Sequence, residues 1–252
     1  MEVISRPKEL ESALGSMFSR LANLMLKNVD VENVLTILEA GCGSGGLTIP
    51  LAERMNGRCR IIAFDMSSGP YEGDLEILRK TVESKKLGQI IKTVRGDVRN
   101  MKDVGNETVD LIISNELFCD LDRRGLEKAL REFHRILKPE GQMAHAELNP
   151  FPANKAQELL IEADSYSLET MTPRPPWFSP SADEVAVVMH KTGFRRICVK
   201  YFETNLKLSP DAALKNLEKW KTDPKFVEKY GKELQRYGLE FPMEHVIFCE
   251  KP

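Results

Sequence analysis

The hydrophobic positions near the start of the chain recur every three or four residues. The residues that carry this period are Leu10, Leu14, Met17, Leu21 and Leu24. The spacing predicts an amphipathic helix from Pro7 to about Asn28, in an N-terminal segment, residues 1–33, that precedes the main fold.

From residue 34 the pattern changes to short apolar runs that alternate with amphipathic stretches. The apolar runs predict strands at 34–40, 60–65, 90–96, 109–114 and 141–148. The amphipathic stretches between them predict helices at 46–55, 74–87 and 125–137. Because the apolar runs are continuous rather than alternating, we expect a parallel sheet that helices cover on both faces.

Beyond residue 148 the strand and helix pattern is interrupted twice. The first insertion, 150–178, has a helical middle and a proline-rich end, and the second, 209–238, predicts one or two amphipathic helices. A helix at 181–193 and a strand at 195–203 lie between them, and a last strand is predicted at 240–250. No linker divides the chain, so we expect a single domain, 1–252, in which the insertions form a cap.

Composition and charge exclude several classes of protein. The 252 residues carry a net charge of -2, which gives no overall attraction to nucleic acid or to an anionic membrane. No apolar run reaches the length of a signal peptide or of a membrane span, so a cytoplasmic protein is expected. The five cysteines are widely spaced without a C-x-x-C pair, which argues against a disulfide framework and against a metal site.

Glycines concentrate in the turn between the first predicted strand of the sheet and the helix that follows. Gly41, Gly43, Gly45 and Gly46 let backbone N–H groups approach a ligand at a helix N-terminus, where negative charge is favoured. The spacing fits both G-x-G-x-x-G, which is typical of a dinucleotide site, and G-x-G-x-G. The glycines alone do not separate these alternatives.

Acidic residues near the ends of the first three strands narrow the choice of ligand. Glu39 precedes the glycines and would repel a pyrophosphate, which disfavours a nicotinamide dinucleotide. Asp65 ends the second strand, where it can accept from two ribose hydroxyls. Asp97 follows the third strand and can accept from an exocyclic amine while Val98 packs on an adenine ring. The ligand implied is a nucleoside with a cationic, amine-bearing tail, and S-adenosylmethionine has these parts.

The segments "ILEAGCGSG", "VDLIISNELF" and "LREFHRILKPEGQM" resemble motifs of the class I S-adenosylmethionine-dependent methyltransferases, in order, over residues 34–148. The last is similar to the branch that includes the ubiquinone and menaquinone methyltransferases. The resemblance implies an α/β fold with a Rossmann-like, seven-stranded sheet, mostly parallel, whose last strand is antiparallel. It also implies S-adenosylmethionine as the cofactor.

The resemblance and the three acids together give the expected cofactor site. The residues expected there are Glu39, Gly41, Cys42, Gly43, Gly45, Asp65, Met66, Asp97, Val98, Asn115, Glu116 and Leu117.

The acceptor side of the site is predicted from position. Glu147 and His145 lie in the fifth strand near the ligand edge of the sheet and are the candidates for a catalytic base. A turn residue and a satisfied structural histidine are the alternative interpretations. The candidates for substrate contacts are Phe18, Phe118, Asn149, Tyr166 and Trp177. Aromatic residues at helical spacing are also typical of a core.

The predicted function is therefore methyl transfer from S-adenosylmethionine to a small-molecule acceptor. No N-P-P-Y or D-P-P-Y motif follows the fourth strand, which disfavours the amino-methylating DNA and protein-glutamine branches. Two alternatives remain: a methyltransferase that acts on a protein or a tRNA, and a binding or regulatory protein that keeps the cofactor fold without turnover.

Overall fold

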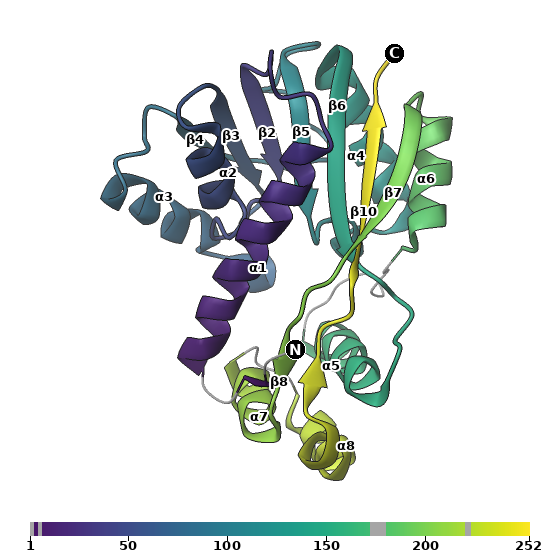
Figure 1. Cartoon of the computed structure of the whole chain (residues 1–252). Helices are drawn as coiled ribbons and strands as arrows, with labels where there is room; N and C mark the ends of the chain where they lie inside the picture. The colour runs from purple at the N-terminus through teal and green to yellow at the C-terminus, as the bar shows by residue number, and fades with distance from the viewer. Residues whose placement is uncertain (1–2, 5–6, 172–179, 220–222) are drawn as a thin grey trace.

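A seven-stranded sheet organises the molecule (Figure 1). The computed structural model describes residues 3–4, 7–171, 180–219 and 223–252. In these residues the strand order is β4-β3-β2-β5-β6-β10-β7, and β10 runs antiparallel to both of its neighbours. The strands are β2 (Thr36–Ala40), β3 (Arg60–Asp65), β4 (Ile91–Arg95), β5 (Val109–Asn115), β6 (Leu137–Leu148), β7 (Arg195–Phe202) and β10 (Glu244–Glu250). The predicted mostly parallel sheet with an antiparallel last strand is confirmed.

Helices cover both faces of this sheet. The buried side chains form two separate clusters, one between the sheet and the helices on each face. The first holds residues of α1 (Pro7–Lys27), α2 (Thr48–Met55) and α3 (Asp74–Ser84). The second holds residues of α4 (Arg123–Ile136) and α6 (Ala182–Lys191). None of the described helices combines the length and apolar character that crossing a membrane would need.

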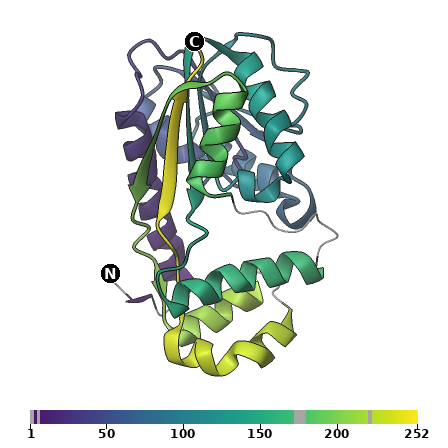
Figure 2. The same cartoon turned by 90° about the vertical axis from the view of Figure 1, so that its right-hand side faces the viewer.

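The two insertions form helices beyond the carboxyl ends of the parallel strands (Figure 2). These helices are α5 (Lys155–Met171), α7 (Pro210–Lys219) and α8 (Pro224–Tyr237). Leu217, Phe226 and Leu234 are fully buried in the same cluster as Leu21 and Met25 of α1. The cap therefore shares the core of one sheet face.

A small second sheet, absent from the sequence predictions, ties the cap to the N-terminal segment. Its order is β1-β8-β9, with β1 (Val3–Ile4), β8 (Lys207–Leu208) and β9 (Leu239–Glu240). The strand predicted over 240–250 is consequently two strands, β9 and β10. Pro242 lies between them and has no N–H to continue a ladder of hydrogen bonds.

The loops at the carboxyl edge have backbone conformations that set where the next helix starts. Between β3 and α3, Ser67, Gly69 and Gly73 have φ values of 45°, 61° and 94°. Left-handed residues cannot continue a right-handed helix. The chain therefore makes a short 3-10 turn, η1 (Gly69–Tyr71), before α3 begins at Asp74, where the sequence predicted its start.

Candidate functional site

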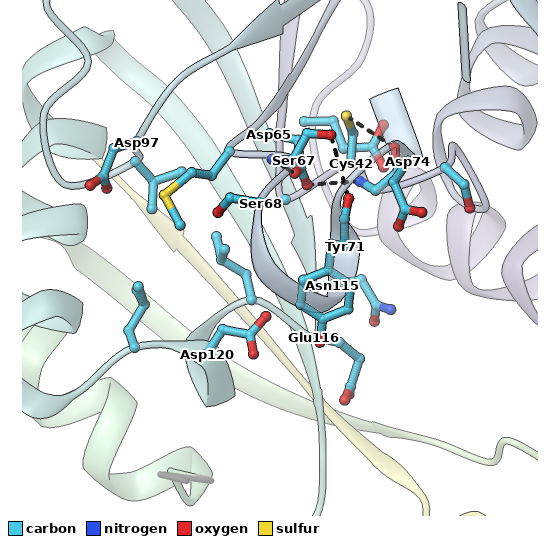
Figure 3. Close-up of a pocket in the computed structure, with 18 of the residues that line it drawn as sticks. Cys42, Asp65, Ser67, Ser68, Tyr71, Asp74, Asp97, Asn115, Glu116 and Asp120 are labelled. Atoms are coloured by element: carbon cyan, nitrogen blue, oxygen red, sulfur yellow. Dashed lines mark hydrogen bonds between the residues drawn. The ribbon is translucent and has the colours of Figure 1, made fainter. Parts of the chain in front are cut away.

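A cavity of about 640 Å³ opens at the carboxyl ends of the central strands. Its walls are the loops that follow β2, β3, β4 and β5, together with Phe18 of α1. Figure 3 shows labelled side chains from Asp97 on one side to Asp74 on the other, with Glu116 and Asp120 from the loop after β5. The crevice where strand order reverses is the place where ligands of open α/β sheets bind.

Nearly all of the residues predicted to hold the cofactor line this cavity. They are Glu39, Gly41, Cys42, Gly43, Asp65, Met66, Asp97, Val98, Asn115, Glu116 and Leu117. Phe18, predicted as a substrate contact, lines it too. Gly45 does not, and the packing explains why: a Cβ on Gly45 would lie 2.4 Å from Leu78 Cδ1, so this glycine lets α3 pack against the loop.

Other residues of this loop also make close contacts with neighbouring elements. Gly46 faces Phe18, whose Cε2 would lie 2.7 Å from an added Cβ. The amides of Gly41 and Cys42 both donate to the Phe64 carbonyl oxygen, at 2.8 and 3.2 Å. Residues 41–46, which we call the glycine loop, therefore pack between α1, α3 and the end of β3.

Asp65 joins two walls of the cavity. Its Oδ2 accepts from the Gly43 amide at 2.9 Å, and its Oδ1 accepts from the Ser67 amide at 2.6 Å. A carboxylate oxygen has more than one acceptor site, so both oxygens retain capacity for a ligand hydroxyl.

Asp97 is held by its neighbour Arg99. The Arg99 guanidinium donates to both carboxylate oxygens, with Nη2 to Oδ2 at 2.7 Å and Nε to Oδ1 at 2.8 Å. These hydrogen bonds lower the pKa of Asp97 despite its partial burial. An adenine amine at this end of the cavity would share the carboxylate with Arg99.

Glu39 is the most deeply buried acid of the cavity. It is 2% exposed, and its Oε2 is buried without a hydrogen-bond partner. Burial raises the pKa of Glu39 to about 8, with a smaller contribution from the charge of Asp65, although the neighbouring Thr48 hydroxyl acts to lower it. A buried carboxylate without a counter-charge is unfavourable, and a cation bound beside it would supply both charge and contact.

Acidic side chains predominate among the described residues of the cavity. In that part of the chain seven carboxyl groups line it: Glu39, Asp65, Asp74, Asp97, Glu116, Asp120 and Asp122. Among the described lining residues Arg99 is the single basic side chain, and Asp97 already binds it. The orphaned oxygen of Glu39 and this charge balance fit the sulfonium and ammonium groups of S-adenosylmethionine. They do not fit a pyrophosphate.

The residues predicted for the acceptor side lie deeper. His145 and Glu147 are 0% and 1% exposed and do not line the cavity. His145 Nδ1 lies 2.8 Å from Ser114 Oγ, its Nε2 lies 3.3 Å from Glu147 Oε2, and its ring stacks on Phe118. Burial opposes ionisation of Glu147, but the hydrogen bond and charge of His145 outweigh it, so the pKa of Glu147 is lowered.

The remaining predicted substrate residues are spread over the cap and its approaches. Tyr166 of α5 packs against Phe226 of α8, with ring centroids 5.7 Å apart. Asn149 Oδ1 accepts from the Phe151 amide at 3.3 Å in a turn. Trp177 lies outside the described residues. The catalytic and substrate roles stay predictions.

Several lining residues were not predicted. They include Ser67, Tyr71, Asp74, Arg99 and Asp120. Most belong to the loops after β3 and β5, whose paths cannot be read from periodicity. The positive φ values of Ser67 (45°) and Glu116 (48°) are of the kind that gathers at binding sites.

Residues 37–141 match the family model described as "Methyltransferase domain". We assign residues 37–141 to a methyltransferase domain on this match. The matched residues run from β2 to β6 and include the glycine loop and Asp65, Asp97 and Glu116, so the family match and the cavity coincide.

Curated relatives of this methyltransferase domain have diverse acceptors in their names. A malonyl-[acyl-carrier protein] O-methyltransferase of Methylovorus sp. is 27% identical over 50% of this chain and 42% of its own length. An ornithine lipid N-methyltransferase of Singulisphaera acidiphila is 25% identical over 48% of this chain and 62% of its own. A tRNA1(Val) (adenine(37)-N6)-methyltransferase of Haemophilus influenzae is 25% identical over 42% and 46%. The chain thus spans about half the length of the curated relatives it matches.

Solved structures share the fold over almost the whole chain. The YcgJ protein of Bacillus subtilis gives a TM-score of 0.65 at 13% identity, covering 92% of this chain and 98% of its own. A geranyl diphosphate methyltransferase in complex with sinefungin gives 0.59 at 15% identity, covering 93% and 78%. At such identities the likeness concerns the fold alone.

Proposed function

We propose that this protein transfers a methyl group from S-adenosylmethionine to a small-molecule acceptor. The observation that carries the proposal is the buried, unpartnered Oε2 of Glu39 in a cavity whose other lining charges are almost all negative. The cofactor supplies an activated methyl group when it is bound. The methyltransferase match over 37–141 and the sinefungin complex of a structure with the same fold support this choice.

Different residues of the cavity bind different parts of the cofactor. Glu39 faces the cationic tail, the glycine loop keeps side chains away from it, and Asp65 receives ribose hydroxyls. Asp97 and Val98 receive the adenine. Displacement at a methyl carbon depends chiefly on alignment and on exclusion of water, so a cavity of this kind can supply much of the acceleration by holding the donor in place.

A small acceptor is favoured over a nucleic acid. The net charge is -2, and acids interleave with the lysines of α7 and α8. A protein that binds nucleic acid through its phosphates presents a basic surface instead.

Calorimetric titration tests the cofactor. We expect S-adenosylmethionine and S-adenosylhomocysteine to bind and NAD not to bind detectably. Asp65→Ala should weaken binding of S-adenosylhomocysteine by about 1 to 3 kcal/mol, because charged hydrogen bonds to the ribose are lost. Asp103→Ala, which removes an exposed acid outside the cavity, is the matched control. Preferential binding of NAD would overturn the proposal.

A further inference from the structure

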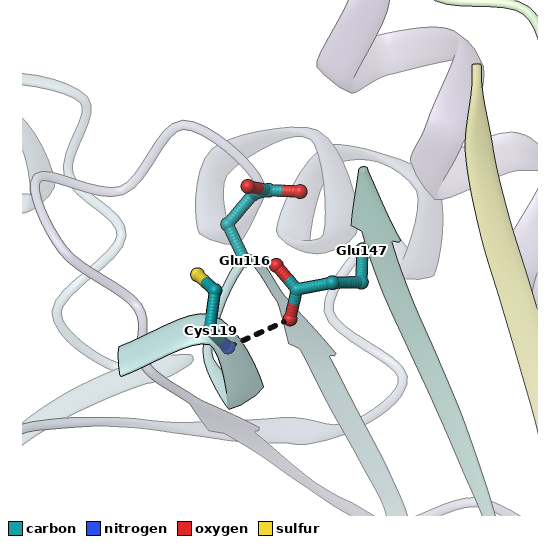
Figure 4. A group of neighbouring side chains, drawn as sticks. All are labelled: Glu116, Cys119 and Glu147. Carbon is teal, nitrogen blue, oxygen red and sulfur yellow. Dashed lines mark hydrogen bonds between the residues drawn. The ribbon is translucent and has the colours of Figure 1, made fainter. Parts of the chain in front are cut away.

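Three side chains with cation-binding chemistry converge next to the cofactor cavity. Glu116 follows β5, Cys119 belongs to the 3-10 turn η2 (Phe118–Asp120), and Glu147 comes from β6. One ligand atom of each lies within 4.8 Å of the others, and Figure 4 shows the three side chains close together. We call Glu116, Cys119 and Glu147 the carboxyl cluster.

The backbone satisfies only part of the carboxyl cluster. Glu116 Oε1 accepts from the Leu148 amide at 2.7 Å. Glu147 Oε2 accepts from the amides of Phe118 and Cys119, at 3.0 and 3.2 Å. Glu147 Oε1, the other oxygen of this 1% exposed side chain, is buried and has no hydrogen-bond partner. The cluster therefore contains a buried acceptor that lacks a donor.

The neighbouring strand adds a second acid of the same kind. Glu244 of β10 lies opposite Leu148, and its buried Oε2 also has no partner. Burial and the charge of Glu147 raise the pKa of Glu244 to about 8. The positive charge that acts on Glu244 is Arg20, whose guanidinium already donates to the carbonyl oxygens of Glu203 and Thr204 at 2.9 and 2.7 Å.

Four of the unpartnered oxygens at this edge of the sheet have a common chemistry. Glu39 Oε2, Asn115 Oδ1, Glu147 Oε1 and Glu244 Oε2 are all hydrogen-bond acceptors, three of them from carboxyl groups. In the same region His245 Nε2 also lacks a hydrogen-bond partner, and a histidine nitrogen can take either role. A cationic ligand with N–H donors would complete the hydrogen bonding of these oxygens and would favour the ionised forms of the carboxyl groups.

Glu116 connects the carboxyl cluster to the methyl donor. It lines the cofactor cavity as well as the cluster, so a group held in the cluster lies next to that cavity. We propose that the methyl acceptor is an amine, which enters as an ammonium cation and places its nitrogen in the carboxyl cluster. This inference rests on the proposed methyltransferase function and names the substrate class.

The transfer balances without a protonated carboxyl group. The ammonium group first gives one proton to water, because the lowered pKa of Glu147 makes its carboxylate a poor proton acceptor, and the nitrogen lone pair becomes free. The nitrogen then forms a bond to the methyl carbon as the bond between carbon and sulfur breaks, and that electron pair stays on sulfur. The positive charge passes from sulfur to the methylated nitrogen, which Glu116 stabilises.

The same cluster selects against other acceptors. A carboxylate or phosphate would meet like charge in a site of low dielectric, where repulsion is strong. An alcohol brings a donor but no charge, and it is much less acidic than an ammonium group. The carboxyl cluster therefore selects among acceptors chiefly by their charge.

The test uses the full chain with S-adenosylmethionine labelled in its methyl group. A metabolite extract is divided into fractions that bind a cation exchanger, an anion exchanger or neither, and labelled products are identified by mass spectrometry. We expect N-methylated products from the first fraction. Label on oxygen, sulfur or carbon in the other fractions would overturn the amine inference and leave the methyltransferase function standing. No label in any fraction would count against both, and failure to bind S-adenosylhomocysteine would locate the fault in the proposed function.

Variants separate the cluster from the cofactor site. With the labelled amine as the acceptor, Glu147→Gln and Glu116→Gln should each lower kcat/KM at least 100-fold. Because Glu147 does not line the cofactor cavity, Glu147→Gln should keep its affinity for S-adenosylhomocysteine within error. Glu83→Gln, which changes an exposed acid of α3, should leave kcat/KM unchanged. Full activity of both cluster variants would overturn the inference. A stoichiometric divalent metal that is found in the purified protein and lost in Glu147→Gln would do so as well.

Discussion

Glu39 is a residue whose charge depends on what occupies the cavity. Its pKa, about 8, exceeds the ordinary value of 4.5 because the side chain is buried. A raised carboxyl pKa means that the folded state holds the proton more tightly than the unfolded chain does. In the ligand-free protein the resulting stabilisation is fully present below pH 4.5 and is lost as the pH rises through about 8.

A cationic ligand reverses the preference of Glu39, because it favours the ionised form. Affinity for S-adenosylmethionine should therefore rise between pH 6 and 8, by up to about tenfold per pH unit, with release of a proton. The uncharged sulfur of S-adenosylhomocysteine should show a weaker dependence. Calorimetry in buffers of different ionisation enthalpy measures the released proton. In Glu39→Gln the difference between the two ligands should vanish, and its persistence would contradict this role.

The glycine loop is the element on which the cavity depends, and two glycines of the chain provide a matched comparison. Gly45 has φ +94° and would place a Cβ 2.4 Å from Leu78, a fully buried residue, so Gly45→Ala should destabilise the fold by about 1 to 3 kcal/mol. A Cβ on Gly15 of α1 would meet no atom within 4 Å, so Gly15→Ala should stabilise by about 0.5 to 1 kcal/mol. Urea unfolding measures both, and shifts in the same direction would contradict the interpretation of the loop.

The main elements could be predicted because each contains enough residues to show a period. β3 was predicted with the bounds that the structure has, and α1 within a residue of its end. The pairs β1 with β8 and β8 with β9 could not be predicted, since strands of two residues have no period and their pairing is set by packing of the cap.

Part of the candidate site could also be predicted from the sequence. Glu39, Asp65 and Asp97 were predicted to line the cavity because they lie at or just after the ends of predicted strands. The pairing of Arg99 with Asp97 and the unpartnered oxygens of Glu147 and Glu244 could not be predicted. They depend on which residues are neighbours in three dimensions, and the order of residues along the chain does not give this.

At the scale of the whole molecule, the cap shares a core with the sheet and lies beyond its carboxyl ends (Figure 2). The start of α5 is anchored, because Asn154 and Gln157 both donate to Glu240 Oε1, at 3.0 and 2.9 Å. An acceptor bound between cavity and cap should therefore slow hydrogen exchange over 155–171, and exchange in α8 serves as the reference. Mass spectrometry with S-adenosylhomocysteine plus acceptor makes the comparison. Unchanged exchange over 155–171 would leave α5 a structural addition.

The position of β10 has a consequence for how the protein is made. β10 is the last strand in the sequence, yet it lies between β6 and β7, and within the described residues it is the only partner of β7 in the large sheet. During synthesis the nascent chain exposes an open β6 edge until residues 244–250 have left the ribosome. Folding of the finished chain must likewise wait for a contact between distant segments, which slows it. Release that stops short of β10 would yield a chain prone to pair its open edge with another copy.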